Sequence, residues 1–118
     1  MGFKGFFKRF SRSDEEILVE EVRDWAEDVV GARPIGGCPC REPIRVAGAV
    51  RRITLRPQES GGGSLEALVS DGTGELRATW TGRVQIPGLH LGKRLVLDGV
   101  IADERGRLKM VNPRFEFA

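Results

Sequence analysis

The sequence predicts a mainly β protein, a small closed barrel of five strands with one amphipathic helix in front of it. Apolar residues first recur at steps of four, three and four, and from residue 44 onward they recur at every second position. No later segment is long enough for a crossover helix between strands. With 118 residues, of which 40% are apolar, the chain can bury one small core, and a typical two-domain enzyme is excluded.

The helix is expected over residues 14–30. Ser13 and Glu16 have the spacing of a capping box, and Gly31 and Pro34 stop the periodic pattern. The opposite face is acidic, because this segment carries eight acids against one arginine, a net charge of −7. The apolar face consists of Leu18, Val22, Trp25 and Val29. We expect Trp25 to dock the helix on the barrel.

The segments on either side of this helix differ from it in composition. Residues 1–13 form a basic aromatic arm with a net charge of +4 and four phenylalanines. Such an arm suits contact with nucleic acid or an anionic membrane surface. The alternative, which has at least as much support, is a disordered tail or one whose phenylalanines pack against the helix. Residues 31–43 are rich in glycine and proline and are interpreted as a linker. From residue 31 onward the net charge is +5.

The rest of the chain alternates with the period of β-strands. The doublet Arg51-Arg52 changes the phase of the first strand and predicts a bulge, and Asp71–Gly74 predicts a tight turn in which Asp71 bonds to its own backbone. Five strands without crossover helices best match an OB-fold, a five-stranded Greek-key barrel, over residues 44–117. The strands are expected at 44–56, around 65–69, around 76–80, at 93–103 and at 107–111.

Several short sequences in this barrel are distinctive. They are Asp71-Gly72-Thr73-Gly74, Trp80 with Gly82-Arg83, Ile86-Pro87-Gly88, and Asn112-Pro113. With them, residues 44–117 resemble the small actinobacterial OB-fold nucleic-acid-binding domain proteins and, more distantly, the OB-fold wedge module of RecG-type branch-migration helicases. The resemblance implies an OB-fold and a nucleic-acid-binding role that follows largely from the fold. It brings no catalytic residues.

Basic residues are placed where OB-folds usually contact nucleic acid, on the face of strands 2 and 3 and on the loops beside it. Guanidinium groups give paired donors to phosphate and can stack on bases. We therefore expect weak, largely sequence-independent binding of single-stranded or branched DNA or RNA, provided that these side chains form one continuous trough. A solvated surface is the alternative. The candidate contacts are Arg51, Arg52, Arg56, Arg77, Arg83, Arg105, Arg107 and Lys109.

Aromatic side chains that could stack on bases are few. The barrel contains Trp80, Phe115 and Phe117 and no tyrosine. Trp80 is in phase with the apolar residues of its strand, so alternation places it in the core, whereas the two phenylalanines could close the barrel or stack. Each stacked base is worth about 1–3 kcal/mol, so affinity for single strands is expected to be low and strongly dependent on salt.

Nothing in the sequence indicates catalysis, so we expect a non-enzymatic protein without a metal or cofactor. The chain has one histidine and no nucleophile–base set. Cys38 and Cys40 supply only two of the four ligands of a closed zinc site. Two cysteines so close together suit a reducing cytoplasm, and we expect neither secretion nor integral membrane association.

The acidic helix suggests two further hypotheses. Residues 14–30, or an open barrel edge, could recruit a protein partner, which would make the chain an adaptor without nucleic-acid binding. Alternatively, the negative charge of the helix could compete with nucleic acid for the cationic groove.

Overall fold

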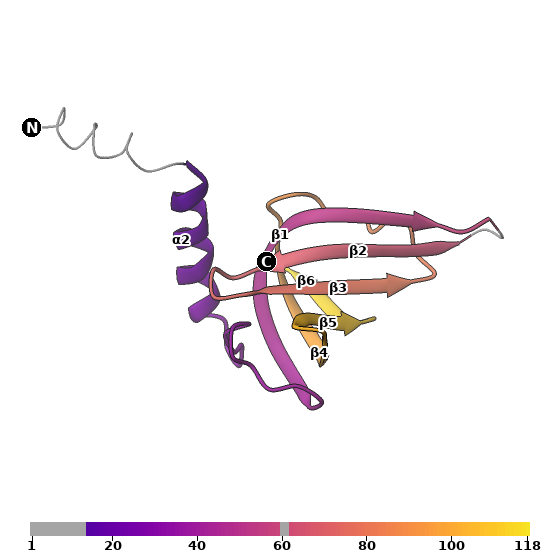
Figure 1. Cartoon of the computed structure of the whole chain (residues 1–118). Coiled ribbons are helices and arrows are strands. Elements are labelled where there is room, and N and C mark those ends of the chain that lie inside the picture. Colours follow the sequence, from indigo (N-terminus) through magenta and orange to yellow (C-terminus); the bar gives the residue numbers. More distant parts are fainter. Residues whose placement is uncertain (1–13, 60–61) are drawn as a thin grey trace, which may run out of the picture.

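The computed structural model describes residues 14–59 and 62–118. Within these residues it confirms a mainly β fold with one helix, in which a single six-stranded sheet curls into a ring (Figure 1). The basic arm and Ser13 lie outside the described residues. The elements are α2 (Asp14–Glu27), β1 (Pro43–Pro57), β2 (Gly63–Ser70), β3 (Glu75–Thr81), β4 (Arg94–Glu104), β5 (Arg107–Val111) and β6 (Arg114–Phe117).

Five strands form the ring in the order β1-β2-β3-β5-β4, and β4 pairs back onto β1. All of these pairings are antiparallel except the one between β3 and β5. The sixth strand, β6, was not predicted. It follows β5 after a break at Asn112-Pro113 and pairs with β4, so β5 and β6 run in succession along the same partner.

The first strand is long because it belongs to two strand pairs. Its first half pairs with β4 and its second half with β2. Gly48 lies where the partner changes, and a Cβ there would approach the carbonyl oxygen of Ser70 to 2.7 Å, so only glycine fits without a shift. The register changes between Val50 and Arg52, which confirms the bulge predicted at Arg51-Arg52.

The core fills the inside of the ring. Inward-pointing residues alternate along every strand with exposed or half-buried ones, as the period of two predicts. Trp80 is only 4% exposed, which confirms its predicted place in the core. The largest fully buried side chains are Ile35, Leu76, Leu95, Leu97, Ile101, Met110, Val46, Val50 and Val69.

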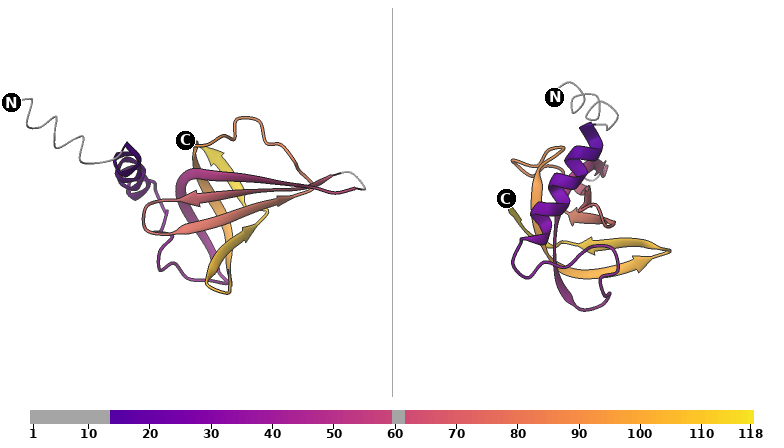
Figure 2. Two further views of the ribbon diagram at one scale, coloured as in Figure 1. Left: turned by 45° about the horizontal axis from the view of Figure 1, so that its top comes forward. Right: turned by 90° about the vertical axis from the view of Figure 1, so that its left-hand side faces the viewer.

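The helix α2 packs against β1 and the β2–β3 turn at one end of the ring (Figure 2). It ends at Glu27, three residues earlier than predicted, and continues as tighter turns in which the Asp28 amide donates to the Trp25 carbonyl. None of its residues is fully buried. Val22, Trp25 and Val29 of the predicted face are half-buried, and Val19 and Arg23 reach Gly72. Leu18, the fourth residue of the predicted face, is 58% exposed.

The segment interpreted as a linker is packed against the ring. Ile35 is fully buried in the core, and its amide donates to Asp71 Oδ2 at 2.9 Å. Asp71 is 3% exposed and, as predicted, also accepts from its own turn, at the amides of Thr73 and Gly74. Sequence composition missed this contact because glycine and proline are also common in tightly folded turns.

Candidate functional site

Three of the predicted basic residues stand in one row across the outside of the ring. The register places Arg52 beside Leu68, Leu68 beside Arg77, and Arg77 beside Lys109. The chain neighbours of Leu68 and Arg77 are fully buried, so this row points outward. Arg107 is two residues from Lys109 on β5 and points to the same side. We call Arg52, Arg77, Arg107 and Lys109 the cationic face.

The three arginines of the cationic face, Arg52, Arg77 and Arg107, line a hollow of about 430 Å³. Leu68, Leu108 and Gly106 of the β4–β5 hairpin also line it. Glu75 is the carboxylate in its lining. The hollow therefore brings together guanidinium groups from three strands.

One carboxylate serves two cations of this face. Glu104 lies 3.9 Å from the Nη2 atom of Arg77 and 3.5 Å from Nζ of Lys109. The Nε atom of Arg77 is buried and has no hydrogen-bond partner within the described part of the chain. The cations thus exceed the carboxylates that neutralise them, and a bound anion would find donors still available.

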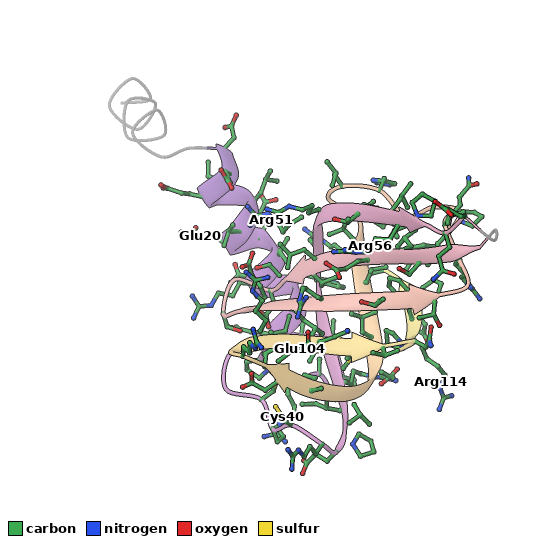
Figure 3. All side chains as sticks on the ribbon, turned by 45° about the vertical axis from the view of Figure 1, so that its right-hand side comes forward. Glu20, Cys40, Arg51, Arg56, Glu104 and Arg114 are labelled. Atoms are coloured by element: carbon green, nitrogen blue, oxygen red, sulfur yellow. The ribbon has the colours of Figure 1, made fainter. Side chains whose placement is uncertain are left out.

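The other four predicted residues lie elsewhere. Arg56 is on the outer side of β1, two side-chain rows beyond Arg52, and Arg105 is at the exposed tip of the β4–β5 hairpin. Figure 3 shows Arg51 beside α2 and Arg114 at another side of the ring. Arg83 lines the same hollow as Arg114. The eight side chains therefore do not form the single continuous trough that the sequence analysis required.

Arg51 is held by the helix. Its Nη2 atom lies 2.6 Å from Glu15 Oε1, and both residues line a mostly apolar groove of about 290 Å³ between α2 and the ring. On the same side, the guanidinium of Arg94 lies over the ring of Trp25 at 5.3 Å. The acidic helix thus engages Arg51 and not the cationic face, which gives no support to direct competition for that face.

A second group of arginines was missed by sequence reasoning. Arg45 and Arg114 line a hollow of about 690 Å³ together with Arg83. Asp98 accepts from Arg45 Nε at 2.8 Å and from its Nη2 at 3.2 Å, and this bidentate pair raises the pKa of Arg45. Arg45 could have been predicted to point outward because it alternates with the buried residues of β1. Arg114 could not have been placed from the sequence, because it lies on β6, which was not predicted.

The aromatic side chains pack together away from the cationic face. The ring of Trp80 lies 5.3 Å from that of Phe115, and Phe115 lies 5.7 Å from Phe117. The Nε1 atom of Trp80 donates to the carbonyl of Pro113, and burial of the ring excludes the stacking role considered for Trp80. Phe117 is 37% exposed, with Lys93 Nζ 5.2 Å from its ring centre.

The two cysteines lie beside the core. Cys38 Sγ donates to the Ile35 carbonyl at 3.0 Å, and desolvation by burial, followed by the nearby Cys40, raises the pKa of the Cys38 thiol. In residues 14–59 and 62–118, no three side chains of His, Cys, Asp or Glu come together as metal ligands. No described helix is long and apolar enough to span a bilayer.

Comparison with families and curated proteins identified no relative of this chain. No family model matches the chain, and no curated protein matches it. The function must therefore be inferred from the cationic face, whose geometry suits a phosphate-bearing ligand.

Proposed function

We propose that the ring is an OB-fold barrel and that its cationic face binds single-stranded or branched nucleic acid weakly, with little preference for sequence. The observation that carries this proposal is the outward row of Arg52, Arg77 and Lys109 on neighbouring strands. The protein acts as a binding protein rather than an enzyme, and its two free cysteines suit the cytoplasm.

The strand order supports the OB-fold assignment. A long first strand is shared by two strand pairs, and the third and fifth strands pair in parallel, which gives a closed Greek-key ring. OB-folds bind oligonucleotides on strands 2 and 3, between the loops that join strands 1 to 2 and 4 to 5. The cationic face overlaps this surface at Arg77 of β3 and extends from there onto β1 and β5, next to the β4–β5 hairpin. The sequence resemblance to actinobacterial OB-fold proteins agrees with it.

Phosphate contacts supply the affinity. The outer surface carries the four cations of the cationic face and, further along, Arg56. It also carries three outward carboxylates, Glu66, Glu75 and Glu104. Each phosphate neutralised on a single strand contributes about 0.7 to the slope of log K against log salt. The aromatic residues considered for stacking lie elsewhere, so guanidinium groups provide the stacking surface and binding is weak.

The proposal is tested by fluorescence anisotropy with labelled single-stranded, duplex and forked oligonucleotides at two salt concentrations. We expect binding to the single-stranded and forked molecules that weakens steeply as salt rises. An absence of binding to all three at low salt would contradict the proposal. Binding that does not change with salt would also contradict it, because phosphate contacts release counterions.

A further inference from the structure

Along its second half, β1 has no neighbouring strand on one edge within the described part of the chain. Its first half, up to Ala49, pairs with β4. At the next residue, the Val50 amide donates to the Lys93 carbonyl and the Val50 carbonyl accepts from Gly92. Beyond this point β1 has β2 on one side, and on the other side no strand of the described chain follows. We call residues 51–57 on this side the free edge.

The free edge has backbone amides and carbonyls that point away from β2 and are spaced to pair with another strand. The Gln58 amide donates to the Gly62 carbonyl, so Gln58 directs its backbone groups toward the β2 side. In an antiparallel pair, successive residues alternate between bonding to the partner strand and pointing away from it. Ile53 and Leu55 therefore direct their amides and carbonyls away from β2. Leu55 lies in the inward phase of β1, opposite Leu65, yet it is 54% exposed. Unpaired backbone groups beside an exposed apolar side chain can accept an added strand.

The free edge also begins at an apolar groove. Val50 and Arg51 line the groove of about 290 Å³ that α2 forms with the ring, and Leu18 and Leu91 line it as well. These two leucines are 58% and 64% exposed. A strand added along the free edge would therefore have an apolar pocket at one of its ends.

The charges on this edge disfavour pairing of its full length with a second copy of the same chain. Antiparallel pairing of two free edges centred on Thr54 would place Arg52 of each copy opposite Arg56 of the other. Like charges directly opposite each other destabilise a strand pair, whereas opposite charges stabilise it. The same arginines therefore favour a strand that carries acidic side chains.

We propose that the free edge of β1 binds an extended acidic segment of a partner protein by strand addition. Acidic side chains of the segment lie opposite Arg52 and Arg56, and its apolar side chains lie opposite Ile53 and Leu55. The main chain of the segment hydrogen-bonds to the outward backbone groups of Ile53 and Leu55. This inference shares Arg52 with the cationic face, but it does not depend on the proposed nucleic-acid binding, because it rests on the outward backbone groups of Ile53 and Leu55, which do not line the hollow.

The test uses a fluorescein-labelled peptide in which glutamate and valine alternate, measured by anisotropy at low salt against the full chain. Leu55→Pro removes the outward amide but keeps the ladder with β2, since that amide faces away from it. Leu55→Ala is the matched control, which removes the side chain and keeps the amide. We expect Leu55→Pro to weaken binding at least tenfold and Leu55→Ala about threefold. Thermal unfolding of both variants verifies that they fold.

Specific outcomes would overturn the inference. One is no binding of the peptide to the unmodified chain. Another is equal binding by the Leu55→Pro and Leu55→Ala variants. Binding that is lost in Arg107→Gln and kept in Leu55→Pro would place the acidic peptide on the cationic face instead. A version of the peptide with lysine in place of glutamate is expected to bind at least tenfold more weakly, and equal binding of the two peptides would remove the role of charge.

Discussion

Arg51 and Arg52 are neighbours in the chain, but they belong to different regions of the molecule. The bulge in β1 sends Arg51 toward α2, where Glu15 pairs with it, and Arg52 to the cationic face, where it lines an open hollow. On the helix side, Arg94 likewise has a dedicated partner in Trp25. On the cationic face, Arg77 and Lys109 share Glu104.

Arginine content alone therefore does not define a binding surface. An arginine with a specific carboxylate or aromatic partner holds elements together, and a ligand would have to displace that partner. An arginine that shares a distant carboxylate remains available to a phosphate. Substitutions on the helix side are therefore expected to change stability, and substitutions on the cationic face are expected to change binding.

The largest effect is expected at Asp71, which anchors the helix side. Asp71→Ala removes a buried carboxylate that accepts from its own turn and from Ile35, so the free energy of unfolding should fall by about 2–4 kcal/mol. Urea unfolding measures it. The control is Asp103→Ala in the exposed β4–β5 hairpin, where the carboxylate accepts from Gly106 and the loss should be about 1 kcal/mol or less. Equal losses would remove the distinction between the two turns.

A smaller effect is expected where α2 docks. Trp25→Ala removes a half-buried ring and its contact with Arg94, and should lower the free energy of unfolding by about 1–2 kcal/mol. Urea unfolding and limited proteolysis measure the change, with cleavage expected to concentrate in residues 14–42. Leu18→Ala is the control on the same helix and should be nearly neutral, because Leu18 is exposed. A loss for Leu18→Ala as large as that for Trp25→Ala would contradict the difference in burial between these two side chains.

The ion pair between Arg51 and Glu15 should contribute less to the free energy of unfolding than Trp25 does. Both side chains are substantially exposed, so a double-mutant cycle with Arg51→Gln and Glu15→Gln should give a coupling of about 0.2–1 kcal/mol. The coupling should decrease as salt is raised. A coupling above that range, or one insensitive to salt, would show that this exposed pair behaves as a buried one.

The smallest effect concerns Cys38, whose pKa is raised by burial. The folded protein binds the thiol proton more tightly than the unfolded chain, so this contribution to stability is present below the unfolded pKa and is lost as pH rises through the folded pKa. In a Cys40→Ser background, iodoacetamide should therefore modify Cys38 with a pH midpoint above that of the urea-unfolded protein. A midpoint at or below that of the unfolded protein would contradict the burial of this thiol.

Much of the fold could be predicted because its signals are local. Alternation of apolar residues located the five ring strands, and the doublet Arg51-Arg52 marked the bulge. Strand β6 was missed because four residues after Asn112-Pro113 are too few for a periodic signal. The packing of Ile35 was also missed, because its partner Asp71 is distant in the chain and composition carries no information about long-range contacts.

The site was less predictable than the fold. Alternation correctly indicates that Arg52, Arg77 and Lys109 point outward, but only the register between strands places them in one row. The partner of Arg51 depends on how α2 docks, and the grouping of Arg83 with Arg45 and Arg114 depends on β6. Charge counting could not separate these groups because it contains no geometry.

The central claim is that the cationic face, rather than net charge, binds nucleic acid. It is tested most directly with two variants that each lose two exposed arginines, Arg52→Gln with Arg107→Gln on the cationic face and Arg83→Gln with Arg114→Gln on the other arginine group. Anisotropy with a labelled single strand should show affinity falling at least tenfold at low salt, and the salt slope falling by about 1.4, for the first variant alone. The second variant should bind within about twofold of the unmodified protein. Equal losses in the two variants, or an unchanged affinity in the first, would contradict the account.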